Sequence, residues 1–236
     1  MVALKLMALM PARGNDKSVM ACKMKIISIA LRAIILLLAA TGCWYVGQGI
    51  YIKAKAVLAQ YLLEQAWADT LAGQPAVKPW PWADTWPVAR LSVPHLGISY
   101  IVLAGAEGNS MAFGPGHLST AVMPGNPGNS VISAHRDTHF RFLEKLRIGD
   151  EVFMQRADGQ SYVFRVNATQ IVDSRTTRLI LDTEVPRLTL LTCYPFDALT
   201  SGGPLRYLVF LTSSTTSFRI VRISIAFKGG PVHIVI

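Results

Sequence analysis

The chain has 236 residues, a length that allows one domain together with a membrane element. Its hydrophobic fraction is 51% and its net charge is +9, but residues 78–212 are nearly neutral, so no nucleic-acid-binding surface is indicated. The three cysteines (Cys22, Cys43 and Cys193) form neither a disulfide framework nor a metal-ligand motif, and no metal or cofactor is predicted.

A basic N-terminus, residues 1–32, precedes an uncharged apolar stretch from Ala33 to Ile52. At ~1.5 Å per helical residue this stretch is roughly 30 Å long, which matches the hydrocarbon core of a membrane. More Lys and Arg residues precede the stretch than closely follow it, so the positive-inside rule predicts a cytoplasmic N-terminus. We therefore expect a single-pass protein of the inner (cytoplasmic) membrane, with its main domain on the extracytoplasmic side.

Two other interpretations of this stretch stay open. A cleaved signal peptide has a shorter apolar region and a small-x-small cleavage site, and neither is evident here. Residues 40–43, Ala-Thr-Gly-Cys, partly resemble a lipoprotein cleavage box, but the apolar run continues beyond Cys43. An uncleaved anchor is favoured.

Residues 53–79 are expected to form a helical stalk and linker. Residues 54–72 show the pattern of an amphipathic helix, which Gly73 and Pro75 should end. The proline-rich stretch 78–82 that follows suits neither a helix nor a central strand.

From Val88 onward the pattern is one of short strands with little helix, which predicts an all-β barrel or sandwich. One or two helical turns are expected at 140–146, and Asp158-Gly159 indicates a hairpin. The expected strands are 88–93, 98–103, 130–135, 152–154, 162–166, 188–193 and 205–210.

Three of these strands carry reactive residues at one end. Cys193 ends an apolar strand, Arg206 opens the next one after a Pro/Gly-rich loop, and His135 ends a strand far upstream. A thiolate, an imidazole that moves a proton and a guanidinium that stabilises an oxyanion together meet the needs of acyl transfer. Taken singly, a buried core thiol, a structural histidine and a surface arginine remain the simpler interpretations.

The segment Thr189-Leu190-Leu191-Thr192-Cys193 resembles the T-L-x-T-C motif of sortases, which are cysteine transpeptidases. Arg206 and His135 stand where that family has its essential arginine and histidine. The resemblance runs from about residue 80 to residue 212. It is closest to the proteobacterial sortases, and further motifs that carry it are 89–91, 114–117 and 135–140.

This resemblance implies a closed eight-stranded sortase-type β-barrel over residues 80–212, with short helices. It implies that Cys193 attacks an LPXTG-like sorting motif near the C-terminus of an exported protein and that the resulting thioester passes to an amine acceptor. His135 and Arg206 would complete the catalytic group. Residues that would bind substrate or support this group are Thr192, His117, Asp137 and Thr138.

Alternatives to transpeptidation are a membrane-anchored cysteine protease that hydrolyses the same kind of motif, and a β-barrel that only binds an exported partner. The C-terminal tail, residues 213–236, departs from the resemblance. It could be an extra edge strand at 218–227, a membrane-surface contact or non-native sequence, and no catalytic role is expected for it.

Overall fold

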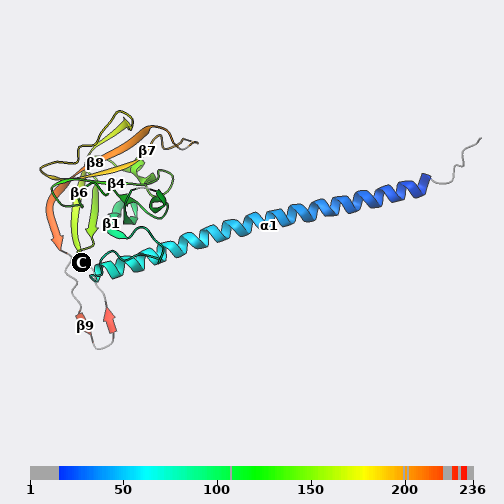
Figure 1. Cartoon of the computed structure of the whole chain (residues 1–236), viewed down its shortest axis with the longest axis horizontal. Coiled ribbons are helices and arrows are strands. Elements are labelled where there is room, and N and C mark those ends of the chain that lie inside the picture. Colours follow the sequence, from blue (N-terminus) through cyan, green and yellow to red (C-terminus); the bar gives the residue numbers. More distant parts are fainter. Residues whose placement is uncertain are drawn as a thin grey trace, which may run out of the picture. The chain divides into compact units, whose positions relative to one another are not determined.

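The computed structural model describes residues 16–106, 108–198, 200, 202–219, 225–227 and 230–232. The chain divides into two compact units, Met1–Lys55 and Ala56–Ile236. Figure 1 shows the long helix α1 (Asp16–Leu71) and the strands that form the barrel.

Helix α1 carries the apolar stretch that the sequence predicts as a membrane anchor. Within Lys23–Leu71 an 18-residue window has a mean hydropathy of 2.3, and none of that window is buried. By length and composition this part of α1 is a candidate membrane span. The helix ends at Leu71, and Gly73, with φ 98°, provides the left-handed turn that follows it.

Eight strands close into a barrel in the order β1-β2-β3-β4-β7-β8-β6-β5, which confirms the predicted fold. The strands are β1 (Pro87–Val93), β2 (Ile98–Ala104), β3 (Gly116–His117), β4 (Gly128–Ser133), β5 (Glu151–Arg156), β6 (Gln160–Asp173), β7 (Pro186–Cys193) and β8 (Leu205–Arg219). Short 3-10 turns lie at η1 (Pro94–Leu96), η2 (Gly108–Ala112) and η3 (Arg141–Lys145). β9 (Ile225–Phe227) and β10 (Gly230–Val232) form a separate two-stranded sheet.

The core of the barrel follows from the alternation of side chains along each strand. β1 alternates between buried and half-buried residues over its whole length, as a strand with one inward face should. The core cluster contains Leu91, Met154, Phe164 and Leu190, and Phe140 and Phe142 near η3 pack against each other edge to face within it. Burial of this apolar area is the main stabilising term for such a fold.

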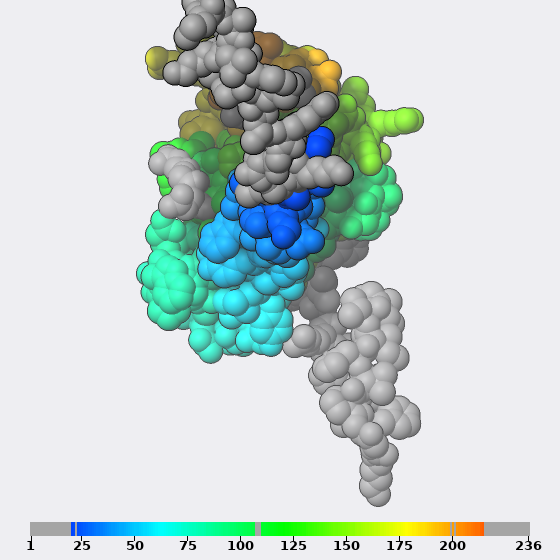
Figure 2. Space-filling model, turned by 90° about the vertical axis from the view of Figure 1, so that its right-hand side faces the viewer, coloured from blue at the N-terminus to red at the C-terminus, as the bar shows by residue number. Residues whose placement is uncertain are grey.

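The last turns of α1 pack on the outside of the barrel. Leu63 and Trp67 form a small buried cluster with Ile101 and Leu103 of β2. Glu64 of the same helix pairs with Arg90 of β1. In Figure 2 the cyan end of α1 and the turquoise segment that follows it lie together at the surface of this unit. The predicted amphipathic helix is therefore present, and its apolar stripe is buried against the barrel.

Several elements differ in length from the sequence predictions. β6 and β8 extend well beyond 162–166 and 205–210, because the two strands pair with each other along almost their whole lengths. The Gly-rich region before Gly128 contains β3, a strand of two residues that is too short to leave a periodic pattern. In the tail, β8 continues to Arg219 and β9 covers 225–227, whereas residues 220–224 of the predicted strand lie outside the described residues.

Candidate active site

Strands β4 and β7 bring the His135 segment beside the Cys193 strand. They are parallel neighbours, and Ser133, the last residue of β4, pairs with Leu191. His135 lies two residues after Ser133, and Cys193 lies two residues after Leu191. Because neighbouring strands are ~4.8 Å apart, this register delivers the histidine and the cysteine to the same rim of the barrel. His135 itself is exposed and follows the strand rather than ending it.

Cys193 also has a charged neighbour on its other side. It pairs directly with Arg206 in the antiparallel register of β7 and β8. Directly opposite residues point to the same face of a sheet, with Cβ atoms ~4.5–5.5 Å apart. The rim therefore presents Cys193 and Arg206 from β7 and β8, and His135 from the segment that follows β4.

Cys193 lies on the outer face of the barrel. Leu188 and Leu190 of the same strand belong to the core cluster, so alternation places Leu191 and Cys193 on the opposite face. Cys193 is half-buried and is a free thiol. The Cys193 side chain is therefore partly accessible from the outside of the barrel.

Thr192 joins the two segments that carry His135 and Cys193. Its hydroxyl is buried and donates to the carbonyl oxygen of Ala134, 2.8 Å away. The Ala134 amide in turn donates to the Leu191 carbonyl at 3.2 Å. Thr192 therefore acts on the geometry of the rim through the backbone.

The Arg206 side chain is oriented by the loop that precedes β8. Its Nη1 donates to the carbonyls of Gly203 (2.6 Å) and Leu205 (2.9 Å). Among the described residues, both hydrogen bonds of this side chain use Nη1, which leaves the Nε and Nη2 donors of the planar guanidinium for another acceptor.

An ion pair between Asp173 and Arg175 lies near the same rim. The pKa of Asp173, at the end of β6, is lowered to about 2, chiefly by hydrogen bonds from Arg175 and with a smaller contribution from Arg206. The Asp173 carboxylate is therefore charged at neutral and weakly acidic pH.

Three further residues singled out from the sequence have separate partners. His117 is buried in β3, with Nε2 2.9 Å from the Val122 carbonyl, and burial lowers its pKa although that hydrogen bond opposes the shift. Asp137 is exposed and pairs with the Arg136 side chain at 3.0 Å. Thr138 is exposed, with Oγ1 3.2 Å from His139 Nδ1.

Arg136 and His139 are residues at this rim that sequence reasoning assigned no role. Arg136 is 5% exposed and makes hydrogen bonds to the loop between β7 and β8. The pKa of His139 is lowered by burial and, to a smaller extent, by the charge of His135, so the two rings are electrostatic neighbours. In the sequence both residues look like ordinary polar residues of a turn, and only the tertiary contacts distinguish them.

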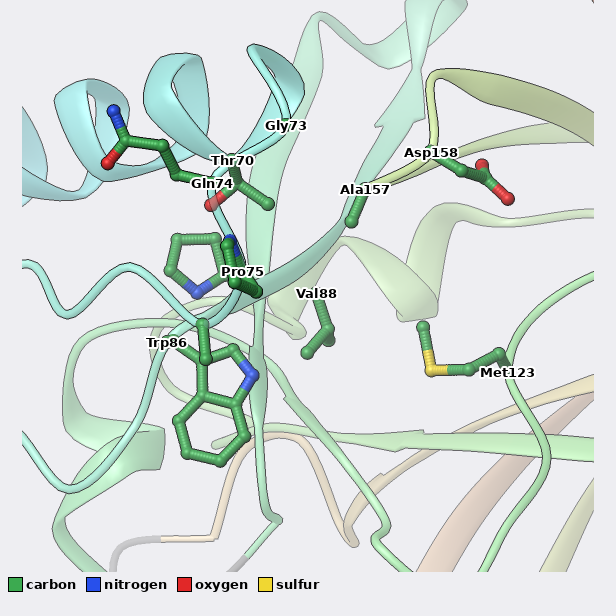
Figure 3. Close-up of a pocket in the computed structure, with 11 residues that line it drawn as sticks. Thr70, Gly73, Gln74, Pro75, Trp86, Val88, Met123, Ala157 and Asp158 are labelled. Atoms are coloured by element: carbon green, nitrogen blue, oxygen red, sulfur yellow. The ribbon is translucent and has the colours of Figure 1, made fainter.

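Figure 3 shows a cavity of about 320 Å³ that is lined by none of His135, Cys193 and Arg206. Asp158, in the hairpin before β6, lines it, whereas β6 meets Arg206 only near its other end, at Val172. Other residues that line it are Thr70, Pro75, Trp86, Val88 and Met123. The cavity is thus separated from Cys193 by most of the length of the barrel, and we do not assign it to the reaction.

The barrel region of this chain is similar to known proteins. The family model of the sortase domain matches residues 91–213, which is more than half of the chain. Sortase D of Bacillus subtilis (strain 168) is 31% identical over 121 residues, a match that covers 51% of this chain and 60% of that protein. The chain therefore spans less than two thirds of the length of this relative.

Solved structures show the same fold at lower identity. Sortase A from Corynebacterium diphtheriae has a TM-score of 0.51 and 22% identity, over 67% of this chain and 85% of that one. A Clostridium perfringens sortase D5 transpeptidase has a TM-score of 0.50 and 21% identity, over 64% of this chain and 88% of that one. With the match to the sortase-domain model, these findings show that the chain belongs to the sortase family.

Proposed function

We propose that this protein is a membrane-anchored cysteine transpeptidase that acts on exported proteins. The observation that carries the proposal is the register of β4, β7 and β8, which aligns His135, Cys193 and Arg206 at one rim. Membership of the sortase family supports a reaction of this class. We also propose that this protein is most similar to the proteobacterial sortases, on the basis of residues 135–140.

In the proposed acylation step the thiolate of Cys193 attacks the Thr carbonyl carbon of an LPXTG-like motif. A C–S bond forms, and the carbonyl oxygen becomes an oxyanion that the Nε and Nη2 donors of Arg206 stabilise. The Thr–Gly C–N bond then breaks, and the leaving amine takes its proton from His135.

In the second step an amine acceptor attacks the thioester and gives a proton to His135. The C–S bond breaks, and Cys193 leaves as a thiolate again. Water in place of the amine would give hydrolysis by the same residues. The products therefore distinguish a transpeptidase from a protease.

Membrane attachment is the second part of the proposal. The uncharged stretch 33–52 of α1 would span the inner membrane once, with the basic residues 1–32 in the cytoplasm and the barrel outside. The substrate would then reach the enzyme after export. This arrangement fits an enzyme that acts on a C-terminal sorting signal.

The test uses the full chain in detergent micelles, with an LPXTG-type peptide that carries a fluorophore and a quencher. Mass spectrometry of the products with and without added triglycine is the readout. We expect a triglycine adduct for the wild type and no cleavage for Cys193→Ala. Cleavage to the free acid alone would support a protease. If the peptide is not cleaved and a thiol-reactive sorting peptide does not label Cys193, only a binding role would remain.

A further inference from the structure

Arg136 is a buried charged residue that the proposed reaction does not use. Its side chain is 5% exposed, although both its neighbours in sequence, His135 and Asp137, are exposed. Nε of Arg136 donates to Oδ1 of Asp137 at 3.0 Å. A guanidinium buried to this extent needs acceptors for its remaining N–H groups, because unpaired buried donors destabilise the folded state.

The remaining donors of Arg136 go to one loop. We call the described residues between the end of β7 and the start of β8, namely 194–198, 200 and 202–204, the β7–β8 loop. Nη1 of Arg136 donates to the Pro195 carbonyl at 2.5 Å, and Nη2 lies 3.0 Å from the Ala198 carbonyl and 3.5 Å from that of Thr200. One planar fork thus collects three backbone carbonyls of the loop, of which that of Pro195 also accepts from the Ala198 amide at 3.4 Å. A lysine, with a single ammonium group, cannot reproduce this geometry.

The position of this contact in the chain gives it a consequence for the rim. On the N-terminal side of His135 and of Cys193, the Thr192 hydroxyl joins β7 to Ala134. On their C-terminal side, Arg136 joins the His135 segment to the β7–β8 loop. Both His135 and Cys193 are therefore held between two connections, and Arg136 makes the second one.

We infer that Arg136 is a positioning residue that sets the geometry of Cys193 relative to His135 by holding the β7–β8 loop. Asp137 orients its guanidinium from the solvent side. This inference rests on the proposed function, because it assigns Arg136 to the same reaction. Arg136 acts through the loop and not by contact with the substrate.

A matched control is available in Arg141. This residue, in η3, also donates to the β7–β8 loop, at the Phe196 carbonyl, and it pairs with Glu144. Its side chain is 50% exposed. Phe196 is itself buried in the core cluster, so packing holds the loop at this point without Arg141. We therefore compare Arg136→Met and Arg136→Lys with Arg141→Met, all in the full chain in detergent micelles.

The first readout is the rate at which iodoacetamide alkylates Cys193 as a function of pH. The reactivity of a thiol depends on the charged groups beside it. If Arg136 sets the position of Cys193 relative to His135, the midpoint of the profile should move in both Arg136 variants. It should stay unchanged in Arg141→Met. A residue that only stabilises the fold would lower the melting temperature without moving this midpoint.

The second readout is cleavage of the sorting peptide. Misplacement of reacting groups lowers the rate of the chemical step. We therefore expect kcat to fall by about 10- to 100-fold in Arg136→Lys, with KM within about twofold of the wild-type value. Should Arg136→Met not fold, Arg136→Lys carries the comparison. An unchanged alkylation midpoint in the folded Arg136→Lys variant would overturn the inference. If the wild type cleaves no peptide, the proposed function fails, but the alkylation profiles still decide the role of Arg136.

Discussion

Cys193 and Arg206 lie directly opposite each other on neighbouring antiparallel strands, although a Pro/Gly-rich loop separates them in sequence. The register, rather than the loop, brings a permanent positive charge beside the thiol. The Arg206 guanidinium donates to the Gly203 and Leu205 carbonyls through Nη1, so the loop also fixes its orientation. The guanidinium therefore has a defined orientation at the rim that carries Cys193.

Replacement of Arg206 should slow acylation of Cys193 without unfolding the protein. Loss of an oxyanion donor costs on the order of 10²–10³ in rate, so Arg206→Ala should fall into this range. Arg206→Lys keeps the charge but loses the planar fork, and it should also be badly impaired. Single-turnover acylation by a sorting peptide, with melting temperatures for each variant, provides the measurement. Near-wild-type acylation by a folded Arg206→Ala would remove Arg206 from the site.

Thr192 offers a test of the connection on the N-terminal side of His135 and Cys193, where its hydroxyl bonds to the Ala134 carbonyl. Thr192→Val removes the hydroxyl at nearly constant volume and leaves the Ala134 carbonyl without its buried partner. The free energy of unfolding should fall by about 1–3 kcal/mol. Thr192→Ser restores the hydroxyl and should recover most of that loss. Chemical denaturation of the three proteins decides the matter, and equal stabilities for Val and Ser would show that the hydrogen bond contributes nothing.

Strands with clear alternation, such as β1, were predictable because one of their faces is buried and the other is not. The alignment of Cys193 with Arg206 was predictable as a hairpin, since one short loop joins two apolar runs. The proposed role of Arg136 was not predictable, because three of its four acceptors are backbone carbonyls of a distant loop, which side-chain identity does not reveal. Strand β3 was not predictable either, because two residues are too few to show the alternation of buried and exposed side chains that marks a strand.

Gly116 in β3 is a position where any side chain should clash. A Cβ there would lie 2.3 Å from the Gly105 carbonyl oxygen and 2.7 Å from the Ala106 Cα, and both are backbone atoms. Gly116→Ala should therefore lower the free energy of unfolding by about 1–3 kcal/mol or more. Gly203→Ala is the control, because its Cβ would meet nothing closer than 4.0 Å. Thermal melts of both variants give the comparison, and equal melting temperatures would contradict the close approach of the backbone.

His117 should make stability depend on pH in the weakly acidic range. Burial lowers its pKa in the folded state from the ordinary value of 6.5, so the unfolded chain takes up the proton first as the pH falls. The contribution of His117 is complete above pH 6.5 and is lost as the pH falls through the lower folded-state pKa. His117→Gln keeps a donor for the Val122 carbonyl and cannot titrate. Its melting temperature should therefore fall less than that of the wild type between pH 7.5 and 5, and parallel curves would argue against a neutral buried histidine.

Leu63 tests whether the end of α1 belongs to the fold of the barrel unit. It is fully buried beside Trp67, Ile101 and Leu103, so truncation to alanine leaves a cavity that the β2 side chains cannot fill without moving. Leu63→Ala should destabilise the unit by about 2–5 kcal/mol. Leu58→Ala, at an exposed position of the same helix, is the control and should change stability by under about 0.5 kcal/mol. Limited proteolysis of the full chain in micelles, in which digestion of the barrel unit is followed over time, measures the difference. If the two variants resist proteolysis equally, the helix contributes no more than a tether, and a truncated chain that begins at residue 80 should fold as well as one that begins at residue 56.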